Sequence, residues 1–223
     1  MKIAEIFHSI QGEGKLAGVP SVFVRSTGCN LRCAWCDTPY TSWKPEGGEM
    51  PVGEILEKVK GFGARHVVIT GGEPMIARGV GELSQGLRNL GLHITIETAG
   101  TVYTPVVCDL MSISPKLGNS TPTGEWALRH DQLRIQIDII QRLMEICASQ
   151  LKFVISSPED IAEIRDIVAR TGASPDDVIL MPEGTHPEAL RQKAVWVAEL
   201  CKAEGFRYGP RLHVDIWGDR RGV

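Results

Sequence analysis

The sequence predicts an α/β fold in which six parallel strands form an open, partial (β/α)6-type barrel with abbreviated helices. Three observations support it: strand-like apolar runs alternate with helical patterns, the chain has only 223 residues, and one loop takes about 25 of them. Alternating strands and helices form parallel sheets with right-handed crossovers. A closed eight-stranded barrel usually needs about 250 residues, so the partial barrel fits the length better. A doubly wound sheet is the alternative, because periodicity does not separate the two folds.

The predicted elements follow in order along the chain. After a glycine-rich N-terminal segment, residues 21–25 are apolar and partly β-branched, which predicts the first strand, and residues 26–50 form a loop. The remaining predicted strands are 66–70, 92–97, 108–112, 151–155 and 178–181. The predicted helices are 51–62, 81–90, 133–148, 158–169 and 187–202. In the third helix, Ile135, Ile139, Leu143 and Ile146 recur at three- and four-residue spacing, as a helix packed on a sheet requires.

Composition argues against several classes of protein. The chain has 24 Lys plus Arg and 27 Asp plus Glu, a net charge of -3, whereas wrapping nucleic acid needs a basic surface that displaces counterions. Its apolar runs are far shorter than the roughly 20 residues that span a bilayer. The first residues contain no apolar signal-peptide region. We therefore expect one domain, residues 1–223, in the cytoplasm, with no nucleic-acid or membrane partner.

Three of the six cysteines lie close together in the loop after the first strand. Cys29, Cys33 and Cys36 have the spacing C-x3-C-x2-C. Structural zinc sites and ferredoxin-type clusters both use four protein ligands, so three thiolates on a four-iron cubane leave one iron free to chelate a small molecule. The other cysteines lie in apolar patterns, where a free thiol packs as a small hydrophobe. These are Cys108, Cys147 and Cys201.

This spacing, with Trp35 directly before the last cysteine, resembles the signature of the radical S-adenosylmethionine superfamily. The resemblance implies a [4Fe–4S] cluster on Cys29, Cys33 and Cys36, and a partial barrel of the kind found in that superfamily. It also implies that the free iron binds the amino and carboxylate groups of S-adenosylmethionine. The reduced cluster then cleaves this cofactor to methionine and a 5'-deoxyadenosyl radical, while the protein positions the cofactor and excludes water.

A second motif, Gly71-Gly72-Glu73-Pro74, follows Thr70 at the end of the second predicted strand. Glycine allows a ligand to approach the backbone closely, although a plain strand-to-helix turn is the alternative. One βα unit after the cysteines, the motif resembles the superfamily's GGEP element, whose backbone and Glu contact the cofactor's amino group. Further positions at the ends of later strands extend the pattern. The residues assigned to S-adenosylmethionine are Ala34, Trp35, Cys36, Asp37, Gly72, Glu73, Glu97, Ser114, Pro115, Lys116, Met181, Pro182, Glu183 and Gly184.

The residues that flank these motifs narrow the resemblance. Three strings and the chain ending resemble the family of 7-carboxy-7-deazaguanine synthases. They are Ile10-Gln11-Gly12-Glu13-Gly14, Val22-Phe23-Val24-Arg25, Cys36-Asp37-Thr38 and the ending from Leu212-His213 to Arg220-Arg221-Gly222-Val223. The resemblance implies a carbon–nitrogen lyase that converts 6-carboxy-5,6,7,8-tetrahydropterin to 7-carboxy-7-deazaguanine with loss of ammonia, on the route to queuosine and other 7-deazapurines. It assigns no catalytic side chain beyond the cofactor and metal sites.

The residue types suit a carboxylated pterin. Gln11 offers amide donors and an acceptor, Glu13 can accept from ring N–H and amine groups, and the planar fork of Arg25 suits a carboxylate. A solvated turn for Glu13 and a surface ion pair for Arg25 are the alternatives. The residues assigned to the substrate are Ile10, Gln11, Gly12, Glu13, Arg25, Thr70 and the chain end Val223.

The resemblance also implies a magnesium ion that bridges substrate and protein at the Thr38 hydroxyl. Mg²⁺ keeps most of its ligands as water and substrate oxygen, so one protein hydroxyl is sufficient. A turn at Asp37-Thr38-Pro39, closed by a side-chain hydrogen bond, is the alternative. The sequence departs from many relatives at Ala99, where an asparagine is expected, so no side-chain role is assigned there.

The implied partners are a small pterin, an electron donor such as flavodoxin or ferredoxin, and a second copy of the chain in a homodimer. Two other functions stay open at this point. One is an activating enzyme that makes a glycyl radical on a protein partner. The other is a non-enzymatic module that binds zinc or transfers electrons.

Overall fold

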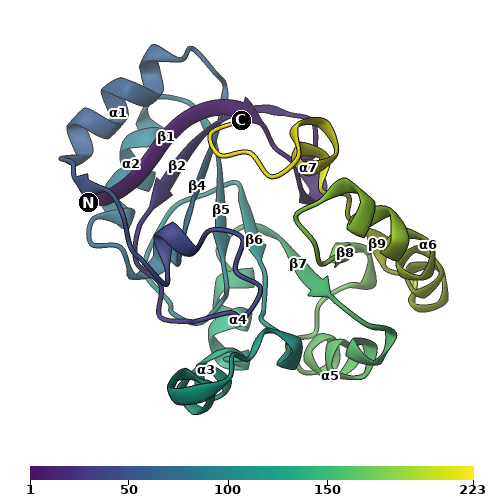
Figure 1. Cartoon of the computed structure of the whole chain (residues 1–223). Helices are drawn as coiled ribbons and strands as arrows, with labels where there is room; N and C mark the ends of the chain where they lie inside the picture. The colour runs from purple at the N-terminus through teal and green to yellow at the C-terminus, as the bar shows by residue number, and fades with distance from the viewer.

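In the computed structural model, which describes all residues 1–223, nine strands form one sheet in the order β3-β1-β2-β4-β5-β6-β7-β8-β9 (Figure 1). The two edge strands do not pair, so the barrel is open. The strands are β1 (Lys2–Ile10), β2 (Pro20–Ser26), β3 (Gly48–Glu49), β4 (His66–Gly71), β5 (His93–Thr98), β6 (Leu110–Ile113), β7 (Ala148–Ile155), β8 (Val178–Pro182) and β9 (Arg207–Tyr208). The six predicted strands are β2 and β4 to β8, and each is parallel to its neighbour in that series. The predicted open parallel barrel is confirmed.

Three strands lie outside that prediction. β1 runs antiparallel to β2 over most of its length. Most of its side chains are half-buried on both faces, so the strand does not need the alternation of apolar and polar residues by which a sequence reveals a strand. β3 and β9 are two residues long and extend the sheet at its two edges. Strands of that length carry no period that a sequence pattern could reveal.

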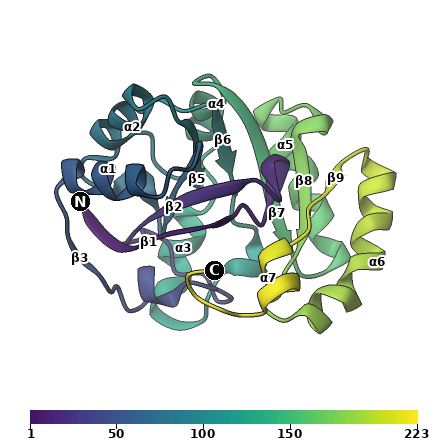
Figure 2. The ribbon, with the colours of Figure 1, turned by 90° about the horizontal axis from the view of Figure 1, so that it is seen from above.

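The helices are α1 (Val52–Gly61), α2 (Val80–Asn89), α3 (Ala127–Leu133), α4 (Ile137–Met144), α5 (Ile161–Thr171), α6 (Pro187–Glu204) and α7 (Leu212–Trp217). Most are short as predicted, residues 99–109 join β5 to β6 without any helix, and α6 alone reaches 18 residues. In Figure 2, helices α1, α2, α4, α5 and α6 surround the sheet on its outer side. None of the helices combines the length and apolar character needed to cross a bilayer.

The prediction of one helix over residues 133–148 is wrong. The chain forms α3 and α4 with a break at residues 134–136, and residue 148 already begins β7. Two side chains at the break explain it. Arg134 donates to the Lys116 carbonyl and pairs with Glu163, while the Gln136 amide donates to main-chain carbonyls near the end of α3. The tertiary contacts of Arg134, together with the local bonds of Gln136, override the helical period.

The core is one cluster of 29 buried apolar residues between the sheet and the outer helices. It includes Ile69 and Ile96 from the central strands and Leu83 from α2, none of which has measurable exposure. Cys108 and Cys201 belong to the cluster and the half-buried Cys147 packs against it, so the predicted packing role of these cysteines is confirmed.

The connection between β1 and β2 reaches β7 (Figure 2). The Lys15 N–H donates to Gln150 Oε1 over 2.8 Å, and the Lys15 ammonium donates to the Ser149 carbonyl over 2.9 Å. Gly14 has a φ of 73°, and a Cβ at this position would lie 2.2 Å from Gln150 Nε2. Glycine is therefore required where the connection crosses the strand.

Candidate active site

A cavity of about 300 Å³ opens where the parallel strands end. Thr70 and Gly71 of β4, Glu97 of β5, Ser114 after β6 and Met181 of β8 contribute to its wall. Open α/β sheets and barrels bind ligands at this end because the loops after the strands converge there. The cavity therefore lies where the predicted motifs were expected to meet.

The three clustered cysteines all line this cavity. Burial raises the pKa of Cys29 to about 11 and that of Cys33 to about 12, so their thiolates need a cationic partner such as iron. No three His, Cys, Asp or Glu side chains converge on the position of a single ion. Thiolates that each bind a different iron of one cluster need no such convergence, and the donor set fits a [4Fe–4S] cluster with one open iron.

The Gly71-Gly72 pair packs directly against the start of the cysteine loop. The Gly72 N–H donates to the Ser26 carbonyl over 3.3 Å, and the Glu73 N–H donates to the Gly28 carbonyl over 2.9 Å. A Cβ on Gly72 would lie 2.3 Å from the Gly28 oxygen, and one on Gly71 would lie 2.2 Å from the Ser26 oxygen. These glycines, predicted to admit a ligand, thus also allow the two loops to touch.

Glu73 lies beneath the cavity. Its carboxylate is fully buried and accepts from Met75 N–H (3.0 Å), Thr98 Oγ1 (2.7 Å) and Ala99 N–H (2.8 Å). Burial raises its pKa, and these three donors partly counter that effect. The side chain holds the end of β5 against the turn after β4, and its predicted contact with the cofactor stays a prediction. Among the residues predicted for the cofactor, those that do not line the cavity are Ala34, Glu73, Pro115 and Pro182.

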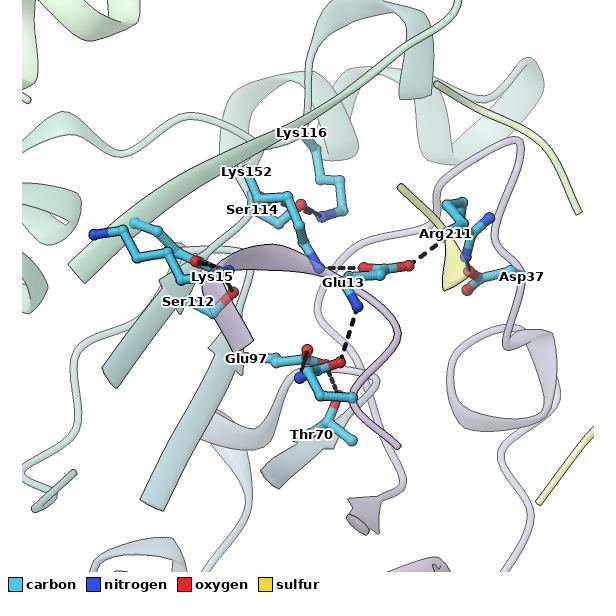
Figure 3. A network of polar contacts seen from close by, with 12 residues as sticks. Glu13, Lys15, Asp37, Thr70, Glu97, Ser112, Ser114, Lys116, Lys152 and Arg211 are labelled. Atoms are coloured by element: carbon cyan, nitrogen blue, oxygen red, sulfur yellow. Dashed lines mark hydrogen bonds and ion pairs between the residues drawn. The ribbon is translucent and has the colours of Figure 1, made fainter. Parts of the chain in front are cut away.

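Three predicted residues from separate segments form one hydrogen-bonded group. Gln11 Nε2 donates to Glu97 Oε1 over 3.1 Å, and Thr70 Oγ1 donates to Glu97 Oε2 over 2.9 Å. Thr70 and Glu97 lie side by side in Figure 3, below the Glu13 loop. The group presents amide, hydroxyl and carboxylate atoms to the cavity, which all three residues line.

Arg25 keeps one edge of its guanidinium free. Its Nε donates to Glu5 Oε1 over 2.7 Å, while its two Nη atoms have no hydrogen-bond partner in the protein. The side chain lines the cavity and lies over the Phe7 ring, 5.6 Å from the ring centroid. The ion pair considered as the alternative exists, yet the outer edge of the fork can still donate to a carboxylate.

Glu13 is held by two buried cations that the sequence pattern did not identify (Figure 3). Its Oε2 pairs with Lys152 on β7, and its Oε1 accepts from Arg211 Nε over 3.0 Å. Burial would raise the pKa of Glu13, but the charges of Lys152 and Arg211 outweigh it and lower that pKa well below its usual range. Glu13 is therefore an ionised, internal residue, and the solvated-turn alternative is wrong. The one sequence feature that could have indicated this pairing is Lys152, a single charged residue inside the apolar run of residues 151–154.

The C-terminal residues 218–223, here named the C-terminal strap, lie along the cavity. Arg221 donates to Glu5 Oε2 over 3.0 Å and to Glu46 Oε2 over 2.9 Å, and its guanidinium lies 3.8 Å from the centroid of the Tyr40 ring. Val223 lies in the cavity wall, where it was predicted.

α7 brings into the wall a further residue, His213, to which the sequence pattern assigned no role in the site. The His213 ring packs on Gly12, where a Cβ would lie 2.0 Å from His213 Nδ1. Burial lowers the pKa of His213, so the neutral imidazole is favoured. This contact explains why the segment after β1 needs glycine at residue 12.

Thr38 also lines the cavity, with its hydroxyl 3.9 Å from Cys36 Sγ. A turn does follow Thr38, but it is closed by the N–H and the hydroxyl of Thr41, which both donate to the Thr38 carbonyl over 2.9 Å, and not by the Thr38 side chain. Lys116 donates to the Ser114 carbonyl (2.6 Å) and hydroxyl (2.9 Å), and Glu183 pairs with Lys193. The long contact with Cys36 Sγ is the one side-chain contact of the Thr38 hydroxyl, which can therefore still bind a ligand in the cavity.

Residues 23–115 match the Radical SAM superfamily. Together with the open parallel barrel and the three cavity cysteines, this match defines the class: a radical S-adenosylmethionine enzyme, which uses a [4Fe–4S] cluster and S-adenosylmethionine.

The chain is 46% identical to 7-carboxy-7-deazaguanine synthase of Halobacterium salinarum, covering 98% of this chain and 91% of that protein. It is 44% identical to the enzyme of that name from Rhodopirellula baltica, covering 99% and 88%. The crystal structure of QueE from Escherichia coli aligns with a TM-score of 0.68 at 26% identity, covering 93% and 92%. The chain belongs to the 7-carboxy-7-deazaguanine synthase family.

Proposed function

We propose that the protein converts 6-carboxy-5,6,7,8-tetrahydropterin to 7-carboxy-7-deazaguanine, a ring contraction that releases ammonia. Substrate and product differ by one molecule of ammonia, so the reaction needs no net oxidant or reductant. One observation carries the proposal. The free edge of Arg25 and the Gln11–Glu97–Thr70 group line the same cavity as the three cysteines. A carboxylate-binding fork and a donor–acceptor group thus lie beside the radical-generating centre.

Each group has a distinct task in this proposal. Cys29, Cys33 and Cys36 hold the [4Fe–4S] cluster, which with S-adenosylmethionine supplies radical chemistry. The Arg25 fork binds the substrate carboxylate. Gln11 and Glu97 bind the pterin edge, because together they offer amide donors and carboxylate acceptors. Held at several points, the substrate keeps one orientation toward the cofactor, which can contribute several kcal/mol to catalysis.

We further propose that Thr38 is the protein ligand of a Mg²⁺ ion that also binds the substrate carboxylate. The available hydroxyl of Thr38 in the cavity wall supports this role. Turnover of the reconstituted enzyme should depend on Mg²⁺ and fall in Thr38→Ala. Thr38→Ser should restore it, because serine keeps the hydroxyl. Turnover indifferent to Mg²⁺ and to both substitutions would disprove the metal site.

The partners beyond the pterin belong to the same proposal. We propose that residues 1–223 act as one domain, that an electron donor such as flavodoxin or ferredoxin reduces the cluster, and that the protein forms a homodimer. The cytoplasmic location stays a prediction. Family membership shows an enzyme and argues against the non-enzymatic module, while a protein substrate remains an outcome of the test.

The test is mass spectrometry of products from anaerobically reconstituted, reduced enzyme supplied with S-adenosylmethionine and 6-carboxy-5,6,7,8-tetrahydropterin. We expect a product with the mass of 7-carboxy-7-deazaguanine in the wild type. Arg25→Gln should lose most of this product and keep the cluster, and Arg25→Lys should recover part of it because the charge remains. Cofactor cleavage without the expected product would leave the superfamily assignment and remove the substrate assignment.

A further inference from the structure

One guanidinium joins three segments around the cavity. Arg211 is 7% exposed and precedes α7. Its Nε donates to Glu13, its Nη2 to Asp37 in the cysteine loop, and its Nη1 to the Gly184 carbonyl after β8. Figure 3 shows Arg211 between Glu13 and Asp37.

The two loops that Arg211 joins do not contact each other through hydrogen bonds or ion pairs. Residues 11–14 bind β7, β5 and the start of α7, whereas residues 28–38 bind the turn after β4 and residues of the β6–β7 connection. Glu13 and Asp37 both present carboxylates to the same guanidinium. Without the cation between them, the two loops would repel each other.

The geometry of the fork explains why arginine is needed here. A guanidinium donates from three nitrogens in one plane, so it fixes the directions of three acceptors at once, whereas an ammonium is a point charge. Lys152 holds the second oxygen of Glu13 and prevents that carboxylate from rotating away. Residues 11–14, here named the pterin loop, are thereby held in one arrangement with the cysteine loop and the loop after β8.

We propose that Arg211 is a positioning residue. It fixes the pterin loop relative to the cysteine loop and so couples cofactor cleavage to substrate conversion. The proposal rests on the proposed function, because it assigns the substrate to the loop of residues 11–14. Reacting atoms must lie about 3–3.5 Å apart, and an error of 1 Å can cost roughly a hundred-fold in rate. When the loops separate, the cofactor is still cleaved, but the substrate is not in place to react.

The test compares Arg211→Lys with a matched control, Arg207→Lys, in reconstituted enzyme. Arg207 is exposed on β9, and its side chain makes no hydrogen bond or ion pair. For Arg211→Lys we expect kcat to fall roughly ten-fold or more, KM for the pterin to change less than about three-fold, and the ratio of 5'-deoxyadenosine to product to rise about five-fold or more. Iron content should stay at the wild-type level, and Arg207→Lys should match the wild type throughout.

The outcomes separate positioning from simple stability. An Arg211→Lys enzyme with an unchanged ratio of 5'-deoxyadenosine to product would overturn the proposal, even if its melting temperature fell. If Arg211→Lys does not fold, Asp37→Ala decides the question, because it removes the contact of the guanidinium with the cysteine loop. Asp37 is also assigned to S-adenosylmethionine, so the readout is again the ratio, which slower cofactor cleavage alone does not change. Asp37→Ala should raise this ratio, and an unchanged ratio would overturn the proposal. A wild-type enzyme that forms no 7-carboxy-7-deazaguanine would instead disprove the proposed function, and this proposal with it.

Discussion

The two halves of the cavity are held by different kinds of interaction. In the cofactor half, the cysteine loop and the turn after β4 are joined by main-chain hydrogen bonds, and glycines permit the close approach. In the substrate half, the segment after β1 is fixed mainly by side chains, beside one main-chain hydrogen bond from Leu212 to Gly12. Glu13 pairs with Lys152 and Arg211, which lie 139 and 198 positions away in the sequence.

This difference determines how each half responds to substitution. Main-chain contacts depend little on side-chain type, except where a Cβ would occupy the contact itself. Buried ion pairs depend on every partner, because the removal of one leaves an uncompensated charge in a low-dielectric setting. The cofactor half should therefore fail through steric conflict, and the substrate half through charge imbalance.

The largest effect is expected for Gly72→Ala. The added Cβ would lie 2.3 Å from the Gly28 oxygen and 2.8 Å from Cys29 Cβ, and the first of these is a main-chain atom that cannot rotate away. The cysteine loop must move, so we expect cluster content to fall at least roughly ten-fold. Iron and sulfide analysis after reconstitution measures it.

The matched control is Gly53→Ala on α1, where nothing lies within 4 Å of the added Cβ. It should retain the full cluster and gain up to about 1 kcal/mol in stability, since alanine favours helix over glycine. Equal cluster content in the two variants would show that the close contact at Gly72 does not hold the cysteine loop.

The next effect is expected for Lys152→Met, which tests the substrate half. Lys152 is 5% exposed, and its loss leaves Glu13 with Arg211 alone, which Asp37 shares. Removal of one partner of a buried pair costs about 3–5 kcal/mol, so the free energy of unfolding in urea should drop by that order. Lys58→Met is the control, because its pair with Glu54 is half exposed and worth under about 1 kcal/mol.

A second substitution sharpens that result. In Lys152→Met with Glu13→Gln, the carboxylate whose charge Lys152 balanced is also removed, and part of the lost stability should return. If the single and double variants are equally unstable, packing rather than charge accounts for the role of Lys152.

The same contrast explains what the sequence could and could not predict. The cysteine spacing and Gly71-Gly72 could be identified because each motif lies within a few residues and the chemistry fixes the spacing. The six parallel strands could be identified because each is a short apolar run between helical patterns. These features together located the cavity and its cofactor half.

Features that depend on distant partners could not be predicted. Arg211 has no local pattern that points to Glu13, and Lys152 stands out only as a charge within an apolar strand. The break between α3 and α4 follows from Arg134, whose partners lie on other segments. In each case the decisive contact forms only after the chain has folded.

A smaller effect concerns acid stability. The pKa of Glu13 in the folded protein lies below its unfolded value of about 4.3, so its stabilisation is complete above that pH and is lost as the pH falls toward the folded value. Glu13→Gln cannot lose this contribution. From pH 6.5 down to about 3.5, its free energy of unfolding should fall less steeply than that of the wild type, by up to about 1.4 kcal/mol per pH unit. Parallel profiles in urea titrations would show that Glu13 is not ionised by its partners.

The smallest effect is expected for Arg221→Gln in the C-terminal strap. Arg221 contacts Glu5, Glu46 and Tyr40 at the surface, so its loss should free the strap without weakening the core. We expect KM for the pterin to rise roughly three- to ten-fold, as for the loss of a few exposed contacts, with kcat and iron content unchanged. Steady-state kinetics at several substrate concentrations separate these constants.

Salt gives an independent measure of the same contact. Exposed ion pairs weaken as ionic strength rises, so high salt should increase the wild-type KM toward that of Arg221→Gln and affect the variant less. Arg191→Gln is the control, because Arg191 pairs only with the exposed Glu188 on α6. A fall in kcat at constant KM in Arg221→Gln would place the strap with the cofactor half of the cavity. An increase in KM alone places it with the substrate half, where Val223 lies in the wall.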